Sequence, residues 1–203
     1  AAYAHLTGPL GIPPEKINGE NTLNPKNYLG PTPWIPFSDE IVRIAGKETR
    51  GRKTPFQKIH ALYDYIYDTM TYNKDGEGWG QGDPIWACSN KRGNCTDFHS
   101  LFIALAGTQN IPARFEIGLP IPHNRTAGEI PGYHCWAQAF DPIRGWIPLD
   151  VSESKKRGEK YFYFKKLGQD RILFSIGRGI TLNPPQKGEP INYFFSPYSE
   201  IDD

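Results

Sequence analysis

A cysteine at the predicted start of a helix is the residue of this chain best placed to do chemistry. Asn94 is a preferred N-cap residue, so Cys95 becomes the first helical residue and Asp97 the third, as in a capping box. Unpaired backbone N–H groups and the positive end of the helix dipole would stabilise a Cys95 thiolate. The same N–H groups could bind the oxyanion of a tetrahedral intermediate. Cys95 is therefore a candidate nucleophile; the alternative is a small cysteine buried in the core.

A histidine and an aspartate that could assist this thiol lie on the two strands of a predicted hairpin, residues 133–140 and 145–150. A five-residue loop at 140–144 would place His134 directly opposite Asp150. A shorter loop would leave them diagonal neighbours on the same face. In either register Asp150 could orient His134 and stabilise its charged form, as the third member of a catalytic triad does. Taken singly, each could instead have a structural role, as a satisfied sheet histidine and as a turn acid.

Further residues near this predicted triad could bind an oxyanion or line a cleft. Two lie on the same strand face as His134, whereas Cys135 would point the opposite way and pack. The other two are tryptophans upstream of the nucleophile. Because aromatic side chains are more often core than site, both interpretations stay open. The candidates are Trp79, Trp86, Trp136 and Gln138.

The elements that must position these side chains are helical in the first half of the chain and extended in the second. Sequential strands after a helical half predict an α+β fold in which the nucleophile helix packs on an antiparallel sheet. Helices are expected over 38–46, 54–70, 83–88 and 94–107, and strands over 113–118, 133–140, 146–150, 172–175 and 191–195.

The first 37 residues differ from the rest of the chain. They are rich in Pro, Gly and Asn and have no sustained periodicity. We therefore expect an extended N-terminal arm over 1–37, which wraps the domain or joins a missing N-terminal neighbour domain, and a single catalytic domain over 38–203. The glycine-rich segment 75–83 is expected to be a flexible loop, because it lacks the spacing and the preceding strand of a phosphate-binding site.

Composition limits the partners. The formal net charge is +1, from 23 basic and 22 acidic residues, which argues against nucleic acid or an anionic membrane as the main partner. No stretch approaches the roughly 18 apolar residues that a membrane span needs. Three cysteines are not a disulfide framework. The compartment is left open, with a periplasmic or secreted protein slightly favoured over a cytoplasmic one, and we expect no cofactor.

Three motifs in the order Cys, His, Asp, with a strand entry after the first, resemble segments of the transglutaminase-like superfamily. Residues 92–102, R-G-N-C-T-D-F-H-S-L-F, look like its nucleophile segment, and the following I-P-A-R at 111–114 looks like the next strand entry. Residues 132–137, G-Y-H-C-W-A, resemble the histidine segment, and residues 145–150, G-W-I-P-L-D, the aspartate segment. The resemblance covers roughly residues 38–203, and the tail looks like that of bacterial members.

The resemblance implies a papain-like core with Cys95 as nucleophile, His134 as base and acid, and Asp150 as its orienter. The implied activity is acyl transfer on a peptide or glutamine-type amide through a cysteine thioester. Hydrolysis by a peptidase or amidase is favoured; the alternatives are a protein-crosslinking transglutaminase and an inactive interaction module. In eukaryotic members a tryptophan upstream of the cysteine helps to bind the oxyanion, which makes Trp79 and Trp86 candidates. A zinc site that includes Cys95 and the nearby His99 is disfavoured, and no metal is expected.

Overall fold

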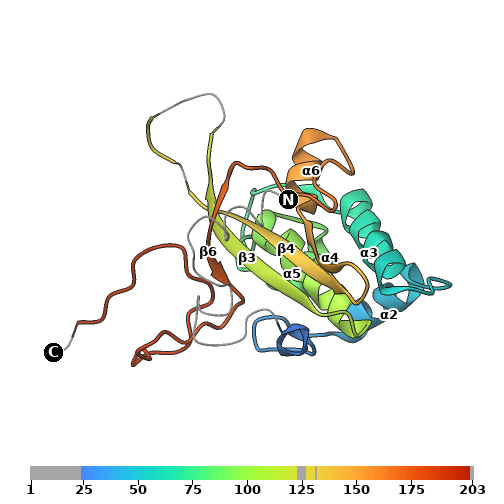
Figure 1. Ribbon diagram of the computed structural model, residues 1–203, viewed down its shortest axis with the longest axis horizontal. Coiled ribbons are helices and arrows are strands. Elements are labelled where there is room, and N and C mark those ends of the chain that lie inside the picture. Colours follow the sequence, from blue (N-terminus) through green and yellow to red (C-terminus); the bar gives the residue numbers. More distant parts are fainter. Residues whose placement is uncertain (1–23, 123–126, 131, 202–203) are drawn as a thin grey trace.

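The computed structural model describes residues 24–122, 127–130 and 132–201, and in this part of the chain it shows helices packed on an antiparallel sheet (Figure 1). The predicted α+β fold is confirmed. The helices are α2 (Asp39–Glu48), α3 (Pro55–Thr69), α4 (Pro84–Asn90), α5 (Cys95–Thr108) and α6 (Val151–Arg157), preceded by the short 3-10 helix η2 (Pro25–Tyr28). The strands are β1 (Thr71–Tyr72), β2 (Arg92–Gly93), β3 (Ala113–Pro120), β4 (His134–Asp141), β5 (Gly145–Leu149) and β6 (Arg171–Ile176).

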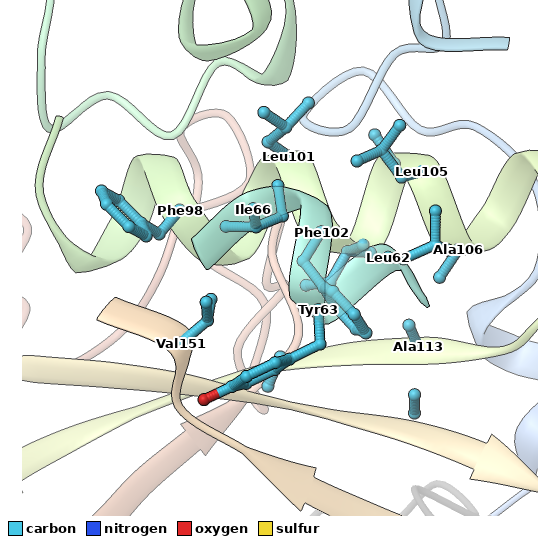
Figure 2. Close-up of a cluster of buried hydrophobic side chains, with 14 of the residues drawn as sticks. Leu62, Tyr63, Ile66, Phe98, Leu101, Phe102, Leu105, Ala106, Ala113 and Val151 are labelled. Carbon is cyan, nitrogen blue, oxygen red and sulfur yellow. The ribbon is translucent and has the colours of Figure 1, made fainter. Parts of the chain in front are cut away.

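Helix α5 is the centre of the core. Its residues from Cys95 to Ala106 are all buried, because one side of the helix packs on the sheet and another on α3. Figure 2 shows Phe98 and Phe102 of α5 close to Ile66 and Tyr63 of α3. A helix buried on all sides places its first turn, which carries Cys95, inside the molecule.

Capping residues fix where the two longest helices begin. Thr54 and Gln57 form a full capping box at the start of α3. At the start of α5, the Asn94 side chain accepts hydrogen bonds from the backbone N–H groups of Thr96 and Asp97, and the Asp97 carboxylate accepts one from Asn94 N–H at 2.9 Å. The predicted cap of the nucleophile helix is confirmed.

The sheet has the strand order β5-β4-β3-β6, with all neighbours antiparallel. In the hairpin of β4 and β5, Asp141 pairs with Gly145 and Ala137 with Leu149. The loop is therefore shorter than five residues, and of the two registers considered for His134 and Asp150 the direct one is excluded. The diagonal register, which was the alternative, is the one observed.

Two expectations about elements are wrong. Helix α6 was not predicted, although it has the signals of a helix: Asp150 as N-cap, Glu153 in the first turn and Gly158 in a left-handed C-cap. The strand expected over 191–195 is absent from the described residues, where only a single bridge joins Ile180 and Ile191.

Most of the predicted N-terminal arm, residues 1–23, lies outside the described residues. Of the rest, Ile35 is buried, and the ring of Tyr28 packs edge-on against Trp146. A boundary between residues 37 and 38 stays a prediction. None of the described helices is long and apolar enough to cross a bilayer.

Candidate active site

The first turn of α5 and the first residue of β4 bring a thiol and an imidazole together. Cys95 is 3% exposed and His134 is 7% exposed. Cys95 begins α5 and His134 begins the packed strand β4, which places the thiol where the charge of His134 acts on it. The other partner of His134 is Asp150, whose Oδ2 lies 2.6 Å from Nε2. Because Asp150 occupies Nε2, Nδ1 is the ring nitrogen left to exchange a proton with a thiol.

The backbone before Cys95 requires a glycine. Gly93 has a φ of +145°, a conformation that L-residues rarely adopt. A Cβ atom at this position would lie 2.6 Å from the Cβ of Asp97, the residue that caps the helix. The turn that orients Cys95 therefore depends on close contact between Gly93 and Asp97.

Electrostatic effects favour a thiolate–imidazolium pair. Hydrogen bonds from the Cys135 thiol and from His134, together with the charge of His134, hold the pKa of Cys95 well below its usual value even though burial acts to raise it. Burial alone would lower the pKa of His134, but the charge and hydrogen bond of Asp150, with the contribution of Cys95, raise it to about 9. A lowered pKa of Cys95 and a raised pKa of His134 favour a negative sulfur and a positive imidazole before substrate binds, as an activated cysteine requires.

The Asp150 carboxylate is completely buried and has partners on both oxygens. Besides His134, Oδ2 accepts a hydrogen bond from Arg171 Nη1 at 2.6 Å. Oδ1 accepts from Ser152 Oγ at 2.8 Å and from Glu153 N–H at 2.9 Å, because Asp150 is also the N-cap of α6. Burial raises the pKa of Asp150, yet His134 and Arg171 outweigh it and hold that pKa well below its usual value. Asp150 is therefore an ionised orienting group.

Cys135 is part of this site, which the sequence did not indicate. As predicted, it points away from the Trp136 face of β4, but that direction leads to the first turn of α5. Its sulfur lies 3.8 Å from Thr96 Oγ1 and 3.8 Å from His99 Nδ1, both in the first turns of the helix that Cys95 begins. The interpretation of Cys135 as packing only is therefore incomplete.

The comparisons with known proteins agree with this geometry. The family model described as the transglutaminase-like superfamily matches residues 42–151, which include Cys95, His134 and Asp150. The chain belongs to the transglutaminase-like superfamily. The family resemblance found in the sequence is thereby confirmed, and this is a family of cysteine-dependent proteases and transferases.

This chain spans 50–60% of the length of the relative and the solved structures that it resembles. A curated relative from Haemophilus influenzae, described only as an uncharacterized protein, is 27% identical over 227 aligned positions; the chain spans 60% of its length, and 93% of the chain is aligned. A candidate cysteine protease from Cytophaga hutchinsonii superposes with a TM-score of 0.58 at 22% identity, over 82% of this chain and 50% of that one. The periplasmic domain of TgpA from Pseudomonas aeruginosa gives a TM-score of 0.47 at 18% identity, over 68% of this chain and 51% of that one.

Two of the predicted oxyanion or cleft residues lie in a buried polar cluster behind His134. Trp136 Nε1 donates to Glu116 Oε2 at 2.5 Å, and Gln138 Nε2 donates to the same oxygen at 3.2 Å. Both side chains are at most 2% exposed. The indole N–H of Trp136 is thus engaged by a carboxylate, and its ring lies 6.3 Å from that of His134. Trp136 therefore packs near His134, and Gln138 belongs to the same buried polar cluster through Glu116.

The two upstream tryptophans lie in or next to the glycine-rich loop. Trp79 Nε1 donates to the carbonyl of Gly76 at 2.9 Å, and the guanidinium of Arg92 lies 5.4 Å from the ring of Trp86. The indole N–H of Trp79 is therefore engaged within its own loop. The role in oxyanion binding that superfamily resemblance implies for Trp79 or Trp86 stays a prediction.

The loop over residues 75–83 is anchored to the nucleophile helix. The Asp97 carboxylate accepts hydrogen bonds from Gly80 N–H at 2.7 Å and Gly82 N–H at 3.1 Å. Arg178 donates to Gln81 O at 2.8 Å and also contacts Gly82 O. The loop expected to be flexible therefore has fixed attachments in its second half. Sequence periodicity gave no signal for Arg178, because its partners are distant along the chain.

No group of three or more His, Cys, Asp or Glu side chains among the described residues is arranged to hold a metal ion.

Proposed function

We propose that the protein is a thiol-dependent acyl-transfer enzyme that hydrolyses a peptide or glutamine-type amide through a thioester on Cys95. The observation that carries the proposal is the arrangement of three side chains: Cys95 begins α5, His134 begins the packed strand β4, and Asp150 Oδ2 lies 2.6 Å from His134 Nε2. The opposite directions in which the pKa values of Cys95 and His134 are shifted support it. Membership of a family of cysteine-dependent proteases and transferases supports it.

The first half-reaction forms the thioester. The Cys95 thiolate attacks the amide carbonyl, and the tetrahedral oxyanion is stabilised by backbone N–H groups at the start of α5. The intermediate collapses as the C–N bond breaks, and the His134 imidazolium gives its proton to the departing amine. Asp150 keeps the ring oriented and stabilises its charged form in this step.

The second half-reaction releases the acyl group. Neutral His134 takes a proton from water as the water oxygen attacks the thioester carbonyl. Cys95 then leaves as the thiolate, and the imidazolium is restored. With an amine in place of water the same step would give a crosslinked amide, so the acceptor distinguishes a hydrolase from a transglutaminase.

Trapping tests the first half-reaction. The protein is incubated with a peptide mixture, and acyl adducts are identified by mass and mapped to a cysteine. An adduct on Cys95 is expected in the wild type and in Cys88→Ala, a variant of a buried free cysteine in α4, and is expected to be missing in Cys95→Ala. Failure to alkylate Cys95 faster than an unfolded thiol at neutral pH would instead support an inactive interaction module.

A second assay distinguishes the acceptors. A glutamine-containing protein is incubated with a fluorescent amine, and both incorporated fluorescence and newly formed carboxylic acid are measured, since ammonia leaves in the first half-reaction with either acceptor. Hydrolysis without incorporation supports a peptidase or amidase. Incorporation without hydrolysis would overturn that preference and favour a transglutaminase. A periplasmic or secreted location stays a prediction, as does a neighbour domain before residue 1.

A further inference from the structure

A second histidine lies directly behind the nucleophile. His99 is one helical turn after Cys95 on α5 and is fully buried. Its Nδ1 lies 2.7 Å from the backbone carbonyl oxygen of Cys95. A carbonyl oxygen can only accept, so Nδ1 carries the hydrogen and donates it. His99 thereby holds the turn from which the nucleophile projects.

The other ring nitrogen faces the carboxylate of the predicted triad. His99 Nε2 lies 3.5 Å from Asp150 Oδ1 and has no hydrogen-bond partner among the residues that the structure describes. Burial lowers the pKa of His99, although the charge of Asp150 opposes the shift. In the neutral ring, with its proton on Nδ1, the Nε2 lone pair faces Oδ1. A buried polar atom without a partner is costly, which suggests a function for this contact.

We propose that His99 is a positioning residue that links the turn bearing Cys95 to Asp150. It donates from Nδ1 to the Cys95 carbonyl at neutral pH, and on protonation it also donates from Nε2 to Asp150 Oδ1. The inference rests on the proposed function of Cys95 as nucleophile. The mechanism itself does not use His99, because His134 performs both proton transfers.

Four titratable groups face the ring from the elements packed around it. Cys95 is on the same helix, His134 and Cys135 are on β4, and Asp150 lies between β5 and α6. Asp150 and the Cys95 thiolate favour protonation of His99, whereas the His134 imidazolium opposes it. By linkage, a proton on His99 favours the thiolate of Cys95 to the same extent that the thiolate favours the proton.

The protonation state is tested on the wild-type protein by two-bond ¹⁵N–¹H spectra of ¹⁵N-histidine-labelled material. At neutral pH, His99 is expected to be protonated on Nδ1 only, whereas His134 is expected to be protonated on both nitrogens. Replacing Cys95 by Ala removes the thiolate and is expected to lower the pKa of His99. A ring protonated on Nε2 alone at neutral pH would overturn the proposal, because Nδ1 could not then donate to the carbonyl.

Variants test the effect on the nucleophile. His99→Phe keeps a planar ring without nitrogens, and His99→Asn restores a donor near the position of Nδ1. We expect the rate constant for alkylation of Cys95 by iodoacetamide at pH 7 to fall about tenfold in His99→Phe and to recover to within about threefold of wild type in His99→Asn. Leu105→Val, a buried change farther along the same helix, is expected to leave this rate unchanged.

The outcomes separate this inference from the proposed function. If wild-type Cys95 is alkylated fast and neither His99 variant slows the reaction, the positioning role is wrong and the proposed function stands. The same conclusion follows if His99→Asn is alkylated as slowly as His99→Phe. If Cys95 of the wild type is alkylated no faster than an unfolded thiol, the proposed function is wrong. If His99→Phe does not fold, two measurements still test the proposal. The wild-type spectra must show a proton on Nδ1 of His99, and the alkylation rate of His99→Asn must be close to that of the wild type.

Discussion

At the scale of single residues, the site depends on how Asp150 can stay ionised while fully buried. Its carboxylate is shared by two cations, His134 and Arg171, and by two hydrogen bonds at the start of α6. A buried ion is tolerated only when its charge and its lone pairs are matched in this way. The result is a raised pKa for His134, and the Cys135 thiol together with the charged His134 lowers that of Cys95.

The pH dependence of kcat/KM tests these shifts. The reactive form needs the Cys95 thiolate and the His134 imidazolium, so activity should rise through the lowered pKa of Cys95 and fall as pH rises through about 9, the pKa of His134. The profile is measured with an amide substrate found by trapping. A basic limb centred near 6.5, the usual pKa of histidine, would contradict the ion pair.

Thermal unfolding against pH checks the same group independently of substrate. The folded-state pKa of His134 is raised, so its stabilisation is fully present below the usual pKa of about 6.5 and is lost as pH rises through about 9. We expect the unfolding midpoint of wild type to fall between these pH values more than that of His134→Gln. If the unfolding midpoint falls equally with pH in the two proteins, protonation of His134 does not stabilise the fold.

Arg171 should be required for the charge of Asp150. Arg171→Met leaves the carboxylate with one cation fewer, so we expect the free energy of unfolding to fall by about 3–5 kcal/mol, as when one partner of a buried pair is removed. Loss of a nearby positive charge should also move the pKa of His134 above about 9. Denaturant unfolding and histidine NMR titration measure the two effects.

The control for Arg171 keeps the charge. Arg171→Lys loses the planar guanidinium but retains a cation near Asp150, so both effects should be smaller. If Arg171→Met unfolds like wild type, Arg171 does not support the buried carboxylate.

At the scale of elements, α5 and its entry turn determine where the nucleophile lies. Asp97 acts twice: it closes the capping box on Asn94, and it holds the N–H groups of Gly80 and Gly82. One carboxylate thus joins the glycine-rich loop to the first turn of the helix. These contacts fix the short turn before α5, and this turn fixes the position of Cys95.

Two glycines allow a matched test of that turn. Gly93→Ala should lower the free energy of unfolding by at least about 2 kcal/mol, because its φ of +145° and its contact with Asp97 leave no room for a Cβ. Gly46→Ala, within α2 and with nothing within 4 Å of the added atom, should raise it by about 0.5–1 kcal/mol. Urea denaturation measures both. If the two substitutions change the free energy of unfolding equally, the turn before Cys95 adapts to a side chain at position 93.

At the scale of the whole molecule, Arg178 joins segments that are far apart in the sequence. Its guanidinium donates to Ser100 Oγ on α5, to the carbonyl of Trp34 and to the loop carbonyl of Gln81, and its Nε donates to Asn192 Oδ1. Burial lowers the pKa of Arg178 to about 10. Through Arg178, the segments before α2 and after β6 are therefore hydrogen-bonded to the glycine-rich loop, next to helix α5.

Removal of this guanidinium should release the loop. In Arg178→Met we expect amide hydrogen exchange over residues 75–83 to increase about tenfold or more, since several hydrogen bonds to the loop and its supports are lost together. Arg50→Met, which changes an exposed cation just after α2, should leave that exchange unchanged. Unchanged exchange in Arg178→Met would mean that Asp97 alone holds the loop.

Local sequence signals were sufficient for the parts of the site that are encoded within a few residues. The cap at Asn94 and Asp97 placed Cys95 at a helix start, and strand alternation put His134 and Asp150 on one hairpin face. These inferences hold because capping and side-chain alternation depend on neighbours along the chain. The hairpin register was left between two possibilities, and the length of the loop after Asp141 decided it.

Only the tertiary structure could reveal the groups that meet the triad from elsewhere. Arg171 reaches Asp150 from the edge strand β6, Cys135 on β4 reaches His99 on α5, and Arg178 contacts residues 78 to 144 positions away. Such contacts depend on how elements pack, which no local periodicity encodes. The sequence by itself determined which thiol, imidazole and carboxylate could act together; the packing determined the charge and position that the surrounding residues impose on them.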